Sequence, residues 1–319
     1  MRVGMQTWGL FGALVLAMLA VDLAVDARER RMAARTESRV AQSIRLRPAA
    51  LWSVAWIGLG LLFGLVVLAL YGSHAMVTYY TAYVVEKSLS VDNLFVFALI
   101  FGELSIPAAD QRRVLYWGIL GALAMRALLI AAGISILDRF HWALYPFAVL
   151  ILLAAARLLF GEQKERKVVV AACAACGSWV ARLIPVTPLR RDGKFWIRQN
   201  GRLAATPLFI ALVIIELSDV VFSLDSIPAV LAITREPFLV YTSNVFAMLG
   251  LRSLYLLLAG AAERFHALRY ALAAILLFVG AKMLSSSVID IPSWLSLAVV
   301  LAILAVTVFV SSGRSKASS

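Results

Sequence analysis

The chain has 319 residues, of which 62% are hydrophobic and only 15% are charged, and its mean hydropathy is +0.90. An ordinary soluble domain has about 25% charged residues, so this composition excludes a soluble globule and a disordered chain. The net charge of +12 suggests nucleic-acid binding at first sight. However, Lys and Arg gather between long apolar runs, which is how membrane proteins mark their cytoplasmic side.

About nine apolar runs have the length of about 20 residues that a helix needs to cross a bilayer. They lie near 5–25, 49–71, 76–101, 114–137, 142–160, 206–233, 239–261, 268–287 and 292–311. The first run is long, and its Arg residues follow it, so we interpret it as a retained helix rather than a signal peptide. The sequence therefore predicts an all-α integral membrane protein with about nine transmembrane helices.

Basic residues alternate from one connecting segment to the next. On one side of the membrane, Lys and Arg number seven in 26–48, two in 105–113, nine in 161–205, two in 262–269 and two in the tail. The alternate connections hold only Arg139 and Arg235, with Arg2 at the N-terminus. This asymmetry predicts an N-terminus outside and a C-terminus in the cytoplasm. The long basic connection has room for a short amphipathic helix, and we expect it to contact anionic lipid.

The two cysteines, Cys173 and Cys176, lie in that same connection. Structural zinc needs four ligands, and none of the three His residues is near in sequence. The pair therefore leaves two readings open: a redox role, or small apolar residues that fill space in an Ala-rich stretch.

Several ionisable residues lie inside the predicted spans, where each costs at least about 2.5–3.5 kcal/mol. The acids are Glu86, Asp92, Glu216, Asp219 and Asp225, and the bases are Lys87, Arg126, Arg157, Arg252 and Lys282. Asp22 lies near the inner end of the first span. Such residues indicate a functional site unless they form ion pairs that only fix helix packing.

Three consecutive spans recur once along the chain. The matched pairs are 90–93 (SVDN) with 223–226 (SLDS), Glu86 with Asp219, Arg126 with Arg252, and Arg157 with Lys282. Because the first copy starts by running inward and the second by running outward, the sequence predicts an inverted repeat of two three-helix units. Transporters with this organisation bind cargo near the midplane, between the repeats.

The predicted organisation has five parts. They are two N-terminal spans with a basic cytoplasmic loop (1–75), the first three-helix repeat (76–161), a basic cytoplasmic loop (162–205), the second, inverted repeat (206–288), and a C-terminal span with a short tail (289–319).

Helical geometry separates some of the acids and joins others. Glu86 and Asp92 lie six residues apart, about 120° around a helix, so they cannot hold one ion from an unbroken straight helix. Glu216 and Asp219 share a face. Pro228 is expected to break its helix and to free carbonyl groups beside Asp225.

The polar residues of the acidic segments offer carboxylate, hydroxyl and amide oxygen atoms as metal ligands. Hard divalent cations such as Mn²⁺, Mg²⁺ and Ca²⁺ prefer oxygen ligands. The candidate metal ligands are Glu86, Asp92, Asn93, Glu216, Asp219, Asp225, Ser226 and Asn244, with Ser90 and Ser223 beside them. The same acids could also form a proton relay. Arg126, Arg252 and Lys282 are candidate counter-ions or gates.

Four stretches together resemble the TerC/Alx family of bacterial membrane proteins. They are EKSLSVDNLFVF from Glu86, QRRVLYWGILGALAMR from Gln111, ATPLFIALVIIELSDVVFSLDSIPAVLAIT from Ala205 and FLVYTSNVFAMLGLRSLYLLL from Phe238. The resemblance covers most of the chain. It implies a multi-pass protein of the bacterial inner membrane that exports Mn²⁺, coupled to protons, in manganese and alkaline-pH homeostasis. The family's acidic residues match Glu86, Asp92, Glu216, Asp219 and Asp225.

Three classes of function can be weighed on the sequence. A secondary transporter is favoured, because no nucleotide-binding loop is present to drive transport by ATP hydrolysis. A non-transporting membrane scaffold in tellurite or envelope-stress resistance is the alternative. An enzyme is not expected, since no nucleophile-plus-base arrangement appears. We expect lipid, Mn²⁺ and protons as partners, with homo-oligomers allowed, no nucleic acid and no permanent cofactor.

Overall fold

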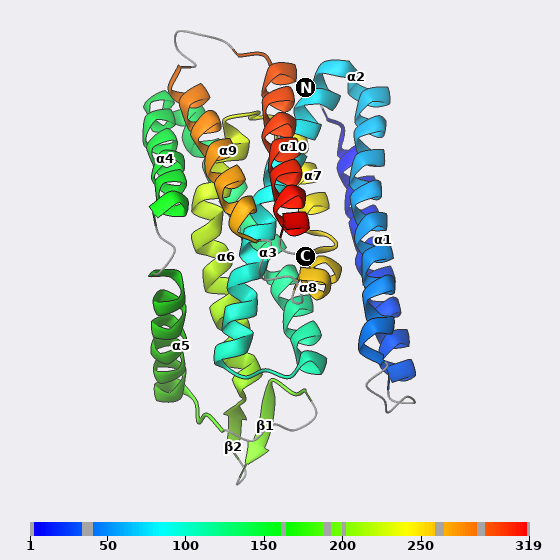
Figure 1. Ribbon diagram of the computed structural model, residues 1–319, viewed down its shortest axis with the longest axis vertical. Helices are drawn as coiled ribbons and strands as arrows, with labels where there is room; N and C mark the ends of the chain where they lie inside the picture. The colour runs from blue at the N-terminus through cyan, green and yellow to red at the C-terminus, as the bar shows by residue number, and fades with distance from the viewer. Residues whose placement is uncertain are drawn as a thin grey trace.

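The computed structural model of the protein describes residues 3–33, 41–160, 164–187, 193–199, 202–258, 265–285 and 291–317. The chain folds into an elongated helical bundle with one small β-hairpin at its lower end (Figure 1). The helices are α1 (Met5–Ala33), α2 (Ala41–Glu103), α3 (Ala108–Arg139), α4 (Leu144–Phe160), α5 (Lys164–Leu183), α6 (Pro207–Leu231), α7 (Pro237–Met248), α8 (Leu251–Leu258), α9 (Phe265–Ser285) and α10 (Ser293–Ala317), with a 3₁₀ turn at His141–Ala143.

The prediction of an all-α membrane protein is confirmed. In the part of the chain that the structure describes, four helices are long and apolar enough to cross a membrane: Met5–Ala24, Ala50–Glu103, Asp110–Arg139 and Pro207–Leu231. Leu144–Phe160 and Ser293–Thr307 are shorter and apolar. Within the described residues, the predicted spans fall mainly on helix, and the span 239–261 is interrupted at Leu249 and Gly250. The inverted repeat and the boundaries of the five parts stay predictions.

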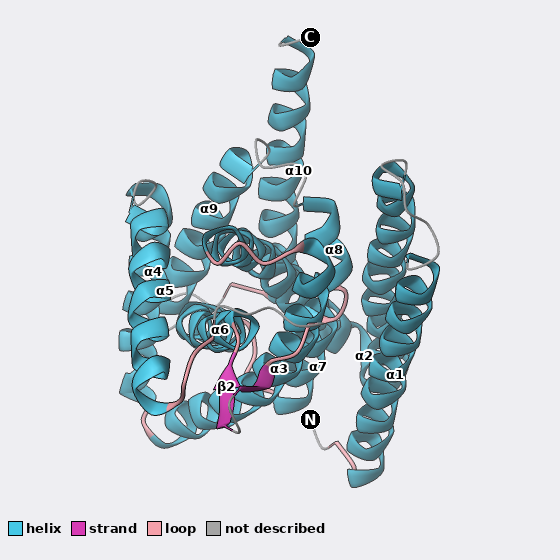
Figure 2. Cartoon of the chain, turned by 90° about the horizontal axis from the view of Figure 1, so that it is seen from below, coloured by secondary structure: helices cyan, strands magenta, loops and turns pink. Residues whose placement is uncertain are grey.

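The predicted spans 49–71 and 76–101 form the two arms of α2, which bends at Gly72. Beyond the bend, the second arm lies alongside the first. Two hydrogen bonds join the arms: Tyr79 donates to the carbonyl of Gly60 (2.9 Å) and Tyr80 to that of Leu61 (2.7 Å). The first arm and α1 lie together at the edge of the bundle (Figure 2). They cover the central helices on one side only.

Close packing between the central helices depends on glycine. A Cβ atom at Gly118 would lie 3.1 Å from Ile215, and one at Gly133 would lie 2.9 Å from Leu231. Both glycines are on α3 and face α6. Small residues at helix contacts allow backbones to approach closely in membranes, where van der Waals packing holds helices together. The approach of α3 to α6 brings Arg126 of α3 beside the acids of α6.

The long basic connection contains more structure than expected. The predicted amphipathic helix is α5, and it is followed by strands β1 (Trp196–Gln199) and β2 (Arg202–Ala205), which pair antiparallel. Trp196 packs on Phe209 of α6, with ring centroids 4.3 Å apart, and the Arg113 guanidinium lies 5.3 Å from the Phe195 ring centroid. The strands were not predicted, although Asn200-Gly201 is a strong hairpin signal.

Gly72 has φ 86° and ψ 176°, a combination that is almost exclusive to glycine. We therefore predict that Gly72→Ala destabilises the fold by about 1–3 kcal/mol, although nothing lies within 4 Å of the new Cβ. Thermal unfolding of the purified protein in lipid nanodiscs measures the effect. Gly58→Ala is the control: Gly58 is helical and equally open, so alanine there leaves stability unchanged or raises it slightly. Equal melting temperatures for both variants would contradict the role of Gly72.

Candidate functional site

The centre of the bundle contains one guanidinium shared by two carboxylates. Arg126 of α3 donates from Nε and Nη2 to the two carboxylate oxygens of Asp219 on α6, both at 3.0 Å, and from Nη1 to Glu86 on α2. The side chains are 0–3% exposed. The two acids are those that the predicted repeat matches, and the structure pairs both of them with one guanidinium.

This cluster contains more negative than positive groups. Glu216 lies one helical turn from Asp219 on α6, and its carboxylate lies against Gly121 of α3, where any side chain larger than hydrogen would overlap it. No hydrogen bond or ion pair joins Glu216 to another described residue. Two carboxylates therefore pair with the single Arg126 guanidinium, and a third carboxyl group, that of Glu216, lies one helical turn from Asp219.

The same helix faces continue in polar residues. On α2, Ser90 and Asn93 follow Glu86 at i+4 and i+7, and on α6, Ser223 and Ser226 follow Asp219 at the same spacing, so each set lies on one face. All four side chains are buried. Among the described residues the hydroxyl groups of Ser90, Ser223 and Ser226 have no hydrogen-bond partner, and neither does the second oxygen of Glu86.

Buried polar atoms without partners are rare in folded proteins and call for an explanation such as water or an ion. Asn244 of α7 adds another, because its side chain is buried and its Nδ2 group has no partner in the described part of the chain. That Asn244 lies near the other candidate metal ligands stays a prediction.

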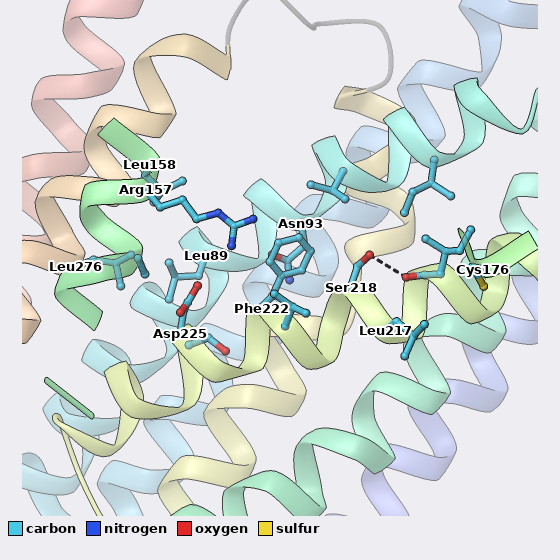
Figure 3. Close-up of a pocket in the computed structure, with 16 residues that line it drawn as sticks. Leu89, Asn93, Arg157, Leu158, Cys176, Leu217, Ser218, Phe222, Asp225 and Leu276 are labelled. Carbon is cyan, nitrogen blue, oxygen red and sulfur yellow. Dashed lines mark hydrogen bonds between the residues drawn. The ribbon is translucent and has the colours of Figure 1, made fainter. Parts of the chain in front are cut away.

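A cavity of about 240 Å³ opens beside these polar faces. Its lining includes Asn93 of α2, Asp225 and Ser226 of α6, and Arg157 of α4, and the rest of its wall is mainly apolar. In Figure 3 the side chains of Asp225 and Arg157 point toward each other across this space. Of the predicted ligands, the structure thus pairs Glu86 and Asp219 with Arg126, places Glu216 one turn from Asp219 against Gly121, and groups Asn93, Asp225 and Ser226 around the cavity.

The side chain of Asp92 lies outside the described residues. In the ranges that are described, no three His, Cys, Asp or Glu side chains are placed so as to hold a metal ion. The Arg126 guanidinium lies between Glu86 and Asp219.

The predicted helix break at Pro228 is wrong. Helix α6 continues through Pro228 to Leu231, and the Pro228 carbonyl accepts a hydrogen bond from the Ala232 N–H (2.9 Å). Proline lacks the N–H that would bond the Leu224 carbonyl, yet α6 continues for three residues beyond Pro228 and ends at Leu231. The carbonyl groups beside Asp225 stay in the helix.

A break occurs instead in the predicted span 239–261, between α7 and α8. Leu249 is extended (φ −60°, ψ 134°) and Gly250 has φ 83°. The ammonium group of Lys87 donates to the carbonyls of Ala247 (2.8 Å) and Leu249 (3.2 Å) at this break. The Gly250 backbone also lies against Trp56 in the first arm of α2, since a Cβ there would lie 2.6 Å from that of Trp56. Sequence reasoning noted Lys87 as a charge but assigned it no role; the Leu-Gly-Leu interruption was the available signal.

The other predicted counter-ions have different partners from Arg126. Arg252 of α8 pairs with Asp22 of α1 (2.9 Å), and Lys282 of α9 donates to Ser296 of α10 (2.9 Å). Arg126 and Arg252 are therefore matched in sequence but differ in environment. Only Arg126 has an ion pair with repeat acids among the described contacts.

Cys173 and Cys176 lie one turn apart on α5 and are buried in the apolar core. Burial raises the pKa of the Cys173 thiol to about 11 from 9.0, and it also raises the pKa of Cys176. The thiolate is the reactive form, so this environment favours the packing interpretation over a redox role.

The chain matches the family described as "Integral membrane protein TerC family" over residues 71–319. The chain belongs to the TerC family. The match begins next to Gly72, so α1 and the first arm of α2 lie outside it. No solved structure matches the chain.

Relatives nevertheless extend over nearly the whole chain. An uncharacterized membrane protein of Myxococcus xanthus is 42% identical and covers 97% of this chain and 92% of its own length. Alx of Escherichia coli K12, provisionally described as a membrane-bound redox modulator, is 40% identical over 95% of this chain and 93% of its own. An uncharacterized membrane protein of Rickettsia bellii is 35% identical, covering 96% and 97%. These TerC-family relatives include the N-terminal helices.

Because Arg126 neutralises two buried acids, we predict that Arg126→Ala lowers stability by about 3–5 kcal/mol, the cost of leaving a buried charge unpaired. Arg139→Ala is the control, since Arg139 is exposed at the end of α3 and has no ion pair among the described residues, and its loss costs little. Thermal unfolding in nanodiscs compares the two. Equal melting temperatures would show that the Arg126 pairs contribute nothing.

The cysteines yield a second prediction for this region. A pKa of about 11 instead of 9.0 leaves about 100-fold less Cys173 thiolate at neutral pH. We expect maleimide labelling of the native protein at pH 7 to be slower than that of the denatured protein by at least this factor, and to accelerate as pH rises. Rapid labelling of the native thiols at pH 7 would restore the redox interpretation.

Proposed function

We propose that this protein is a secondary transporter that exports Mn²⁺ from the cytoplasm, in exchange for protons. The observation that carries the proposal is the joining of Glu86 and Asp219, from the two predicted repeats, by a single buried guanidinium. A cation-transport site that lies between two repeats needs acids from both of them at one point.

The donor set supports a hard divalent cation as cargo. The cavity and the polar faces present carboxylate, hydroxyl and amide oxygen from Asp225, Ser226 and Asn93, and such ligands suit Mn²⁺, Mg²⁺ and Ca²⁺. Cys176 also lines the cavity, but burial raises its pKa and so disfavours the thiolate that a soft metal prefers. Resemblance to the TerC/Alx family selects Mn²⁺ among the hard cations.

Proton exchange would supply the energy. Moving two charges outward against a potential of 100 mV, negative inside, costs about 4.6 kcal/mol, and the sequence has no nucleotide-binding loop. In this scheme Mn²⁺ displaces Arg126 from Glu86 and Asp219, and protons on the same acids return the site to its starting charge.

Placement in the bacterial inner membrane with the C-terminus inside completes the proposal. The β-hairpin and the start of α3 lie together at the lower end of the bundle in Figure 1, and that end carries Arg112, Arg113 and Arg198. Basic residues at one end favour a cytoplasmic location for it.

The proposal is tested with purified protein in liposomes that contain a Mn²⁺-sensitive dye. We expect uptake driven by a pH gradient, with a loss of at least about 10-fold for Asp225→Asn and Asp92→Asn, because the neutral amide neither exchanges protons nor attracts the cation as a carboxylate does. Asp138→Asn is the matched control: Asp138 is an exposed acid near the end of α3, and its loss leaves transport unchanged.

A scaffold is the second candidate, since Arg126 neutralises its acids in the manner of a structural ion pair. A scaffold predicts that these substitutions change thermal stability but that no variant, nor the wild type, moves Mn²⁺. Undiminished flux in both Asp variants would remove the proposed site while leaving transport intact.

A further inference from the structure

The break between α7 and α8 exposes backbone carbonyl groups that a helix would otherwise use. Helix α7 ends at Met248, and Leu249 and Gly250 leave helical geometry before α8 begins at Leu251. The last carbonyls of a helix lack intrahelical donors and carry the negative end of the helix dipole. In a membrane such groups require another partner, because lipid provides none.

Lys87 supplies that partner from the second arm of α2. Its ammonium group lies 2.8 Å from the Ala247 oxygen and 3.2 Å from the Leu249 oxygen. It forms no ion pair with any described carboxylate, although Glu86 is its neighbour in the chain. A cation held by carbonyl oxygens alone, at a helix break, is the coordination that discontinuous transporter helices give to a monovalent ion.

We propose that the α7–α8 break is a monovalent-cation site that the Lys87 ammonium occupies as a tethered ion. Two observations support this: the Ala247 and Leu249 carbonyls lie where α7 ends at Met248, and the Lys87 ammonium is seated on both of them. The break is held in place from the other side by Trp56, so the carbonyls keep their arrangement when Lys87 is shortened. Removal of the ammonium then leaves a site for an inorganic cation of the alkali series.

The inference does not require Mn²⁺ as cargo, since the carbonyl site is separate from the Glu86–Arg126–Asp219 cluster. Nor does it follow from charge alone, because Lys282 is also partly buried in the bundle yet donates to a hydroxyl group. A purely structural Lys87 would cap α7 in the same place, and the two roles differ in what happens when the side chain is cut back.

The test measures equilibrium binding of ²²Na⁺ and, as a K⁺ substitute, ⁸⁶Rb⁺ to purified protein in nanodiscs. We expect saturable binding of one ion per chain to Lys87→Ala and to Lys87→Ser, and none to the wild type or to Lys87→Arg, which keeps a cation in the site. The same ion raises the melting temperature of the Ala and Ser variants only. The two isotopes show which ion size fits.

Absence of saturable binding in folded Lys87→Ala and Lys87→Ser, with both ions, overturns the proposal and leaves Lys87 as a helix cap. Binding to the wild type at the same level also overturns it, since the site would then not be filled by Lys87. Mn²⁺ transport by the wild type is measured in parallel, so a failure of this inference is distinguished from a failure of the transport proposal.

Discussion

The sharing of Arg126 between Glu86 and Asp219 is the interaction on which the centre of this membrane protein depends. Three ionised groups lie where solvent exposure is 3% or less, and none of them could remain charged there alone. Their geometry requires α3 to approach α6 closely, and the glycines at 118, 121 and 133 permit it. Removal of Arg126 would leave two buried carboxylates without a cation, whereas removal of either acid would leave one balanced ion pair.

An ion pair of this kind is a poor choice for stability alone, because well-packed apolar residues often stabilise a fold equally well. Its retention beside a cavity with Asp225 and Asn93, and beside buried hydroxyl groups without partners, is explained better by a site that exchanges cations. The protein's own Arg126 and Lys87 both occupy positions that suit a mobile cation. This shared feature links the acid cluster to the helix break.

Much of this arrangement could be predicted from the sequence because a bilayer imposes simple rules. Span length, basic connections and the cost of buried charge gave the helices and the list of acids, and the repeat matched Glu86 with Asp219 before any geometry was known. Partners of the bases could not be predicted in this way. Arg126 and Arg252 match in sequence, yet Arg252 pairs with Asp22 of α1, a helix outside the repeat.

Errors in the prediction arose where backbone conformation depends on tertiary contacts. Pro228 appeared to be a breaker, but near the end of α6 it fits the helix, whereas the break at Gly250 is held open by Trp56 and Lys87, which are distant in sequence. The β-hairpin was missed because its basic residues suggested only a topology signal.

The most direct test of the central claim is a structure of the wild-type protein in lipid nanodiscs with bound Mn²⁺. The account predicts Mn²⁺ coordinated by Glu86 and Asp219 with the Arg126 guanidinium displaced from both; Mn²⁺ bound elsewhere while both Arg126 ion pairs persist would contradict it.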